Sequence, residues 1–596
     1  MRERSGLFVA PENPVQSLSV QAETVVVQKR RSQFGVLVAH LLHRFFHNEL
    51  LTSDDETKRV MLISYAVALP GLLVAMFLFP AYHGFPPYPL HRSFWSQASD
   101  HYFYVMYSFV VMGAATVYEW DLLFPDLLDI FVLSVLPIAR ERLFFGRVLA
   151  LGIFLGLVLA GTSAFGTILL PLVAEQHSFL RHLLAHAIAV TMSGVFGAAI
   201  FLSLQGVLLN VVGEQIFRRI TPVLQGASIM VLLAILLLHP TISASLRPLL
   251  GSDSPAVQYF PPFWFLGVYE RIMGGPSSEP IFHSLARTGC WAVMLMVVCT
   301  LVTYPLAYRR RVRQLIEGAR AVDSSLNSYG AIDGLLHATI LRRPKQRAVF
   351  HFVHQTILRY QRQRVMVALF GGLCVALALS EMVVLHVSRG HVRPGLLATG
   401  IRAAIPILVF WIVAGLRAVM SAPVDRRGRW IFSTIAGRPR AEHLSGANIW
   451  ITLWAVILSL GAIGILRMLS PGSLGGENAL AGQLIVAVGL ALLVSDLFLY
   501  SVRTVPFTHL RPSSITDMPL AIVRYFVVFP IFVAVTVHFE GWIEASTKHL
   551  IQTALVFAVA HLLLQGAHTQ SIERTAVDIE ISETDEFPQS LGLRDA

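Results

Sequence analysis

The chain has 596 residues, of which 55% are hydrophobic and only 14% are charged, against about 25% charged in an ordinary soluble domain. This composition excludes a soluble globular protein and indicates an all-α polytopic membrane protein. The net charge of +10 does not indicate nucleic-acid binding, because the basic residues cluster between apolar runs, which is the positive-inside pattern of membrane proteins.

The first elements are expected to lie outside the membrane core. Residues 1–32 are polar and lack the apolar stretch of a cleavable signal peptide, so we expect a disordered cytosolic N-terminus. Residues 34–51 carry apolar side chains at helical spacing with histidines and arginine between them, which predicts an amphipathic helix on the membrane surface. Residues 347–360 repeat this pattern and predict a second such helix.

Apolar runs of about 20 residues are long enough to cross the hydrocarbon core of a bilayer. Twelve such runs predict transmembrane helices at residues 60–80, 101–119, 147–173, 183–211, 222–239, 287–308, 366–388, 395–420, 449–468, 479–501, 519–539 and 548–567. Arginine and lysine are several-fold more frequent in one set of connecting loops than in the other. This asymmetry places both termini in the cytosol.

The elements follow the same order twice. Each part of the sequence has an amphipathic helix, two spans, a charged cytosolic element, two spans, a shorter cytosolic loop and two further spans. This order predicts two parallel six-helix repeats. The expected domains are the N-terminus (1–32), the first half (33–308), a basic cytosolic linker (309–346), the second half (347–567) and an acidic cytosolic tail (568–596).

The segment 239–286 lies between the fifth and sixth expected spans, on the outer side. It contains the aromatic cluster 259–265, and aromatic side chains favour the lipid headgroup region. We expect this segment to anchor the chain at the membrane surface. An external gate or substrate portal is the alternative.

Residues 120–147 lie between the second and third expected spans. Acidic and basic side chains flank an apolar middle that Pro125 and Pro137 interrupt. Such a segment is too charged at its ends to cross a bilayer and too apolar to leave its surface. We expect it to lie on the cytosolic face and to present a surface to a soluble partner. A helix that only completes the membrane surface is the alternative.

Charged side chains inside expected spans usually face the interior of a helix bundle, because exposure to lipid is costly. They are Glu119, Glu381, Arg402, Asp496 and Arg524. Similar depths on neighbouring spans predict one pair between Asp496 and Arg524 and another between Glu381 and Arg402. Structural pairing is the expected role, and a proton or substrate relay is the alternative. Glu119 lies near the cytosolic end and fits the adjoining loop equally well.

The sequence contains no phosphate-binding loop, hydrolase nucleophile motif or zinc-protease helix. We therefore expect no enzyme activity, cofactor or metal in this chain. His182 and His186 share one helix face at a spacing that suits a metal, but no carboxylate or cysteine nearby in the sequence completes a site. Cys290, Cys299 and Cys374 lie in apolar spans and indicate packed thiols rather than disulfides.

The stretch from Leu127 to Arg147 contains Leu-Leu-Asp, then Leu-Pro-Ile, and ends in Leu-Phe-Phe-Gly-Arg. It resembles ABC-2 type export permeases, in which Leu-Pro-Ile/Val, a few charged residues and Gly/Ala-Lys/Arg precede the third span. The stretches 119–126 and 505–508 are similar to those of large bacterial membrane proteins typical of Acidobacteria, which look like two fused ABC-2 halves.

This resemblance implies the permease subunit of an exporter in the bacterial inner membrane, with ATP bound by a separately encoded ABC ATPase. In that family the region between the second and third spans docks on the ATPase. The implied docking residues are Asp126, Asp129, Pro137, Arg140, Arg142 and Arg147 in the first half, and Arg426, Arg427 and Arg429 in the second. The second half lacks Leu-Pro-Ile, which is a departure from the pattern. A secondary transporter and a non-transporting scaffold or permease relic are the alternatives.

Overall fold

The computed structural model describes residues 33–46, 56–88, 92–120, 122–125, 138–174, 178–212, 214–252, 255–317, 330–388, 391–421, 441–469, 477–500, 502, 506–507 and 524–575. This part of the chain is almost entirely helical and includes one two-stranded hairpin. Within it, nine helices are long and apolar enough to cross a membrane. The expectation of a helical, polytopic membrane protein is therefore confirmed.

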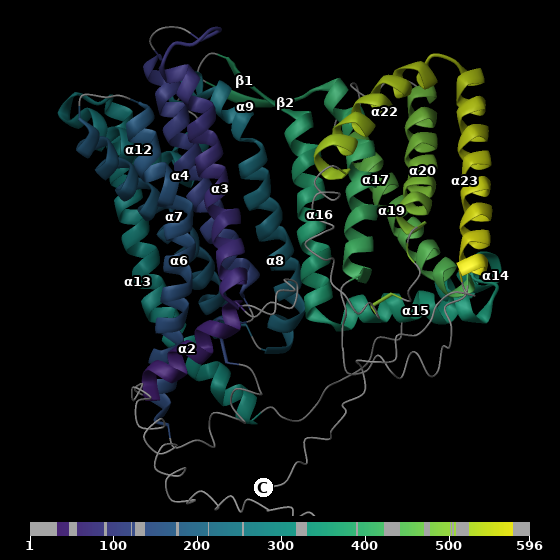
Figure 1. The fold of residues 1–596 in the computed structure, drawn as a ribbon, viewed down its shortest axis with the longest axis horizontal. Helices are drawn as coiled ribbons and strands as arrows, with labels where there is room; N and C mark the ends of the chain where they lie inside the picture. The colour runs from purple at the N-terminus through teal and green to yellow at the C-terminus, as the bar shows by residue number, and fades with distance from the viewer. Residues whose placement is uncertain are drawn as a thin grey trace, which may run out of the picture.

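A helix lies over each of the twelve apolar runs (Figure 1). In the first part of the chain these helices are α3 (Glu56–Tyr82), α4 (Phe94–Tyr118), α6 (Arg140–Val173), α7 (Phe179–Val211), α8 (Glu214–Leu237) and α13 (Pro280–Glu317). In the second part they are α16 (Gln361–Met382), α17 (Ala398–Ser421), α19 (Ala441–Leu469), α20 (Glu477–Leu499), α22 (Phe529–Glu544) and α23 (Thr547–Thr575). A short π-helical turn, η3 (Arg524–Val528), leads into α22.

The helices α3, α4 and α22 are not among the nine apolar membrane-length helices of the described chain. Asp100 and His101, together with several tyrosines, lower the hydropathy of α4. α22 has only 16 residues, and the described apolar part of α3 is the short stretch Val67–Tyr82. α4 is therefore less apolar, and α22 shorter, than the sequence runs alone indicate.

The seventh expected span, 366–388, extends six residues beyond the end of its helix. Its helix stops at Met382, and β1 (Val383–Ser388) pairs antiparallel with β2 (His391–Leu396). The adjacent β-branched residues Val383 and Val384 favour an extended backbone over a helical one. A short hairpin therefore joins α16 to α17 in an otherwise helical fold.

The helices form two groups that lie side by side, α2 to α13 and α14 to α23 (Figure 1). The helices α8 and α16 pack together where the two groups meet. Two glycines allow this close approach: a Cβ on Gly226 would lie 2.8 Å from the Ala368 Cβ, and one on Gly372 would lie 3.1 Å from the Met230 backbone. Small residues at such a contact are typical of helices that pack within membranes.

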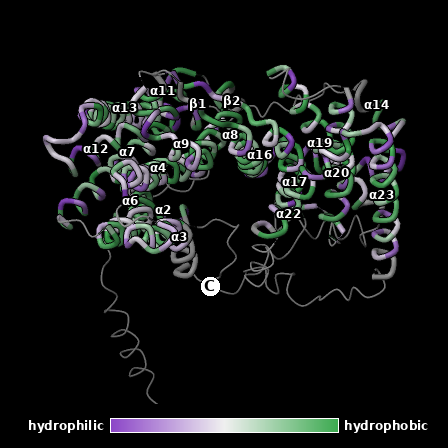
Figure 2. The backbone as a smooth tube through the Cα atoms, turned by 90° about the horizontal axis from the view of Figure 1, so that it is seen from above, coloured by the Kyte–Doolittle hydropathy of each residue, from purple (hydrophilic) through white to green (hydrophobic). Residues whose placement is uncertain are grey.

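Hydrophobic residues run through both groups when they are seen from above (Figure 2). Many of them face outward on helices at the edges, such as Leu295 and Leu301 of α13 and Leu555 and Leu562 of α23, each more than 60% exposed. In water, an outer surface of this kind would be unstable. Contact with lipid tails explains it.

Each group begins with a helix that lies across one end of its bundle: α2 (Gln33–Phe46) and α15 (Pro344–Arg359), the latter after α14 (Gly330–Thr339) (Figure 1). We call this end the α15 end and the opposite end, which carries β1 and β2, the hairpin end. Both amphipathic stretches are thus helical, and each buries one apolar face. The buried residues are Leu37, Val38, Leu41 and Phe45 in α2, and Val349, Phe350, Val353 and Ile357 in α15.

At the hairpin end, the segment between α8 and α13 folds into α9 (His239–Ala244), α10 (Leu246–Leu250), α11 (Pro255–Tyr259), α12 (Pro261–Gly274) and the 3-10 turn η1 (Gly275–Ser277). α12 packs among α4, α7 and α13. Phe263 and Phe265 are buried there, whereas Tyr259 is 77% exposed. Most of the aromatic cluster that we expected at the lipid headgroups therefore belongs to the core of the first group.

Candidate functional site

The predicted docking element after the second span is described only in part. Asp126, Asp129, Pro137, Arg426, Arg427 and Arg429 lie outside the described residues. The beginning of the element is fixed to the bundle near the α15 end: the Gln205 amide donates to the Trp120 carbonyl oxygen over 2.8 Å, and the Tyr304 hydroxyl donates to the Leu123 carbonyl oxygen over 2.6 Å. Trp120 and Leu123 are both buried.

The three arginines at the end of this element differ in their exposure. α6 begins at Arg140, seven residues before the expected span, and Arg140 and Arg142 are exposed in its first turn. Arg147 lies two turns into α6 and is only 6% exposed. The neighbouring Gly146 packs against Leu37 of α2. Arg140 and Arg142 can therefore meet a soluble partner, whereas the burial of Arg147 does not fit that role.

Asp496 is buried near the α15 end of the second group, but with partners other than the predicted Arg524. The Asn448 amide donates to one carboxylate oxygen over 2.9 Å, and His561 Nδ1 lies 2.5 Å from the other. The side chain of Arg524 lies outside the described residues. The predicted pair between Asp496 and Arg524 therefore lies outside the described residues. The partners that are described come from α19 and α23, on which α20 packs.

The predicted pair between Glu381 and Arg402 does not form. Arg402 of α17 donates to Glu544 at the end of α22, with 2.7 Å between Nη2 and Oε2. Glu381 is exposed in the last turn of α16, so its pairing with Arg402 was wrong. Glu119 follows the last turn of α4 as its C-cap and is 8% exposed. It therefore marks the end of the helix.

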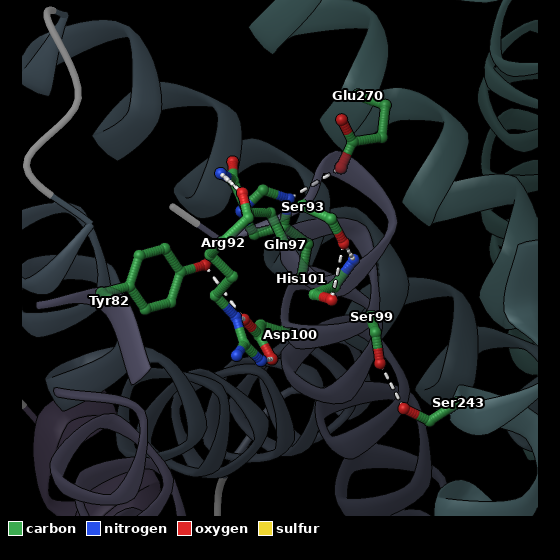
Figure 3. A network of polar contacts seen from close by, with 10 residues as sticks. Tyr82, Arg92, Ser93, Gln97, Ser99, Asp100, His101, Ser243 and Glu270 are labelled. Carbon is green, nitrogen blue, oxygen red and sulfur yellow. Dashed lines mark hydrogen bonds and ion pairs between the residues drawn. The ribbon is translucent and has the colours of Figure 1, made fainter. Parts of the chain in front are cut away.

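A network of polar contacts joins α3, α4 and α9 at the hairpin end of the first group (Figure 3). Arg92 donates from Nε and Nη2 to the two oxygens of Asp100, over 2.6 Å and 2.7 Å, and Tyr82 donates to the same carboxylate over 3.0 Å. Burial alone would lower the pKa of Arg92, but its hydrogen bonds to Asp100 and the charge of that carboxylate outweigh burial and raise it. Through Tyr82, the last residue of α3, the Asp100 carboxylate connects α3 to α4.

Beside this network, His101 of α4 faces Glu270 of α12 (Figure 3), with 2.7 Å between His101 Nδ1 and Glu270 Oε1. The two residues are 2% and 4% exposed. The imidazole ring of His101 also stacks on Tyr269, with 4.1 Å between the ring centroids. One acid–base pair therefore connects α4 and α12 in the interior.

The two histidines of α7 complete this cluster. The ring of His182 lies 5.2 Å from that of His101, and His186 Nδ1 lies 3.3 Å from the Tyr269 hydroxyl oxygen. Both histidines are fully buried. Among the described residues no group of three His, Cys, Asp or Glu side chains is arranged to hold a metal ion. We call His101, His182, His186, Tyr269 and Glu270 the histidine cluster.

Sequence reasoning found only part of the histidine cluster. The spacing of His182 and His186 indicated a shared helix face, which the structure shows. Glu270 was missed because it follows an aromatic run that we assigned to the membrane surface, and its partner His101 lies 169 residues away. A carboxylate within an apolar, aromatic segment was the available signal.

Comparisons with protein-family models, curated proteins and solved structures gave no match to this chain.

Proposed function

We propose that this chain is the membrane-spanning permease of an ATP-driven exporter, resembling the ABC-2 type, and that a separate ATPase drives it. In this proposal the two helix groups are parallel six-span halves of the inner membrane protein, with the α15 end in the cytosol. Transport would follow a shift in population between inward-open and outward-open arrangements of the halves.

The observation that carries this proposal is that corresponding helices pack alike in the two groups. α2 packs on α6 as α15 packs on α19, and α4 packs on α6, α7 and α8 as α17 packs on α19, α20 and α22. The contact between α7 and α13 corresponds to that between α20 and α23. The two groups differ in their first spans, because α3 packs on α6 whereas α16 packs on α8 and α17. Shared order and shared packing together support a duplicated transport unit.

A close contact at the α15 end adds to this support. A Cβ on Gly146 of α6 would lie 3.1 Å from the Leu37 side chain of α2. A Cβ on Gly446 of α19 would lie 2.6 Å from the Gln346 carbonyl oxygen of α15. In both groups a glycine near the start of the third span thus receives the amphipathic helix. Such a helix can transmit the movement of a bound partner to the span beneath it.

The proposed docking surface for the ATPase includes Arg140 and Arg142, which are exposed at the α15 end. Two cations on the first turn of a helix suit an acidic surface on a partner, and such contacts mainly set the association rate and partner choice. Arg147 is better explained as a structural residue, because it is buried.

The test is co-purification of the full chain with the ATPases encoded beside its gene. We expect one of them to bind the wild-type protein and to hydrolyse ATP faster in its presence. The double variant Arg140→Glu/Arg142→Glu should weaken this binding by at least about tenfold, because it turns two attractive contacts into repulsive ones.

The control is Arg247→Glu/Arg393→Glu, which makes the same change in charge at exposed positions of the hairpin end. It should bind the ATPase like the wild type. Absence of any bound ATPase would overturn the proposal in favour of a scaffold or permease relic. Substrate movement that follows a proton or sodium gradient without an ATPase would overturn it in favour of a secondary transporter.

A further inference from the structure

The histidine cluster contains more hydrogen-bonding capacity than its neighbours satisfy. His101 Nε2, both ring nitrogens of His182 and His186 Nε2 are buried without a hydrogen-bond partner in the described chain. A neutral imidazole needs a donor partner and an acceptor partner, and buried polar atoms without them are costly. Several such atoms around one carboxylate point to a site that serves more than stability.

The ligand that suits this site is small. A Cβ on Gly166 of α6 would lie 2.7 Å from the ring of Tyr104 and 2.9 Å from His186 Nε2, so helix backbone already fills that side of the cluster. The described residues also offer no group of three ligating side chains in metal-binding geometry. Unpartnered imidazole nitrogens beside a carboxylate can, however, take up a proton without any further space.

We propose that the histidine cluster is a proton-binding site that controls how firmly α12 is held in the first group. The pair His101–Glu270 is the contact that joins α12 to α4. His182 is the adjacent base on α7. This proposal does not depend on the ATPase, because a proton site can regulate an ATP-driven permease or power a gradient-driven one.

The net charge of the cluster in each protonation state gives the direction in which pH changes the hold on α12. With one proton shared between His101 and Glu270, the pair is neutral overall, which is the form that a buried site favours. A second proton leaves a net positive charge in the interior, either on this pair or on His182. That charge is costly until water reaches it. Acidification should therefore loosen the contact of α12 with α4 and α7.

Other ionisable groups also lie around His101. Those that face it or its neighbours are Tyr82, Arg92, Asp100, Tyr104, His186, His239, Tyr269, Arg271 and His283. Arg92 and Asp100 neutralise each other. The ring of His239 contacts Tyr102 and Phe103, which both belong to α4, so His239 is not part of the contact between α4 and α12.

The second group has a different contact at the corresponding place. There, Arg402 of α17 pairs with Glu544 of α22. α4 and α17 are the second expected spans of their halves, and Glu270 and Glu544 both lie between the fifth and sixth. Arginine does not lose its proton in proteins, so this contact does not offer the base that histidine provides.

The experiment is hydrogen–deuterium exchange of the full chain in lipid nanodiscs, from about pH 8 to about pH 5, corrected for intrinsic exchange rates. A histidine that water reaches in the released state takes the ordinary histidine pKa of about 6.5, which falls in this window. We expect protection of the peptide covering α12 to fall on the order of tenfold with acidification, equivalent to one unit of pKa difference between the held and released states.

Two variants test the assignment. Glu270→Gln keeps a carbonyl oxygen that can accept from His101 Nδ1 but removes the ionisable group, so α12 should lose most of its pH dependence. His182→Asn should reduce it, and this second variant keeps the test valid if the first does not fold. The control His239→Phe should retain the wild-type response.

A wild-type α12 whose protection does not change with pH would overturn the proposal. So would a response that survives in both Glu270→Gln and His182→Asn, or one that His239→Phe abolishes. Loss or retention of ATPase binding has no bearing on these outcomes, which separates this test from that of the proposed function.

Discussion

Each helix group carries a pair of a basic and an acidic side chain at the hairpin end, but the two pairs differ in chemistry and burial. His101 and Glu270 are 2% and 4% exposed. The side chains of Arg402 and Glu544 are 39% and 12% exposed. In the first group, Glu270 lies in α12, which packs among α4, α7 and α13. In the second, only residues 545–546 separate α22 from α23.

This difference shows how one arrangement of helices can give two unlike contacts. Water screens a partly exposed ion pair, so forming or breaking it changes the free energy little. A buried pair is strongly interdependent, because each charge has only its partner in place of water. We therefore expect a single proton to change the contact between His101 and Glu270 more than the contact between Arg402 and Glu544.

We expect Glu270→Ala to have the largest effect on stability. Removing one member of a buried ion pair costs about 3–5 kcal/mol, because His101 then keeps no partner for Nδ1 and a cavity forms beside Tyr269. We expect the free energy of unfolding in detergent micelles, measured by titration with a denaturing detergent, to fall by that amount.

The matched control is Glu279→Ala, an exposed glutamate that precedes α13 in the same connecting segment. Its cost should stay within about 0.5 kcal/mol, as is usual for surface positions. If Glu270→Ala cost as little as this control, His101 and Glu270 would not be a tightly coupled pair, and the contrast between the groups would be lost.

A second comparison concerns the glycines beneath α2 and α15. A Cβ on Gly446 would meet a carbonyl oxygen of the α15 backbone, which cannot move without shifting the helix, and overpacking of this kind costs about 1–3 kcal/mol. A Cβ on Gly146 would meet the flexible end of Leu37, and the higher helix propensity of alanine offsets that contact by about 1 kcal/mol.

We therefore expect Gly446→Ala to reduce protection of α15 from hydrogen–deuterium exchange, whereas Gly146→Ala leaves α2 close to the wild type. Equal losses at both positions would mean that α2 is held as rigidly as α15. Equal tolerance would mean that α15 can shift on α19, and that the short contact at Gly446 is not a constraint.

The positions of the helices could be predicted from the sequence because the length of an apolar run is a local property. The ends could be predicted less well: α16 stops at Met382 because the β-branched residues that follow it form a strand, although they are just as apolar. α6 begins before its apolar run, because its first turns carry charged residues such as Arg140 outside the buried part of the bundle.

The partners of buried charges could not be predicted, because they depend on which helices pack together. Arg402 was placed at a suitable depth but paired with Glu381, whereas α17 presents it to Glu544 on α22. Glu270 has no local pattern at all that points to His101. The contact exists only because α12 folds back among α4 and α7, and nothing in the residues 239–286 alone indicates that return.

We expect the smallest effect on stability at the pair of Arg402 and Glu544 in the second group. Arg402→Gln should lower the free energy of unfolding by less than about 1 kcal/mol, because the Arg402 side chain is 39% exposed and water can replace it beside Glu544. A double-mutant cycle of Arg402→Gln with Glu544→Gln should give a coupling energy in the same range. The equivalent cycle of His101→Gln with Glu270→Gln should give more, because that pair is buried. If the Arg402 cycle gave the larger coupling, the second group would hold the more strongly coupled contact, and exposure would not explain the difference between the two ends.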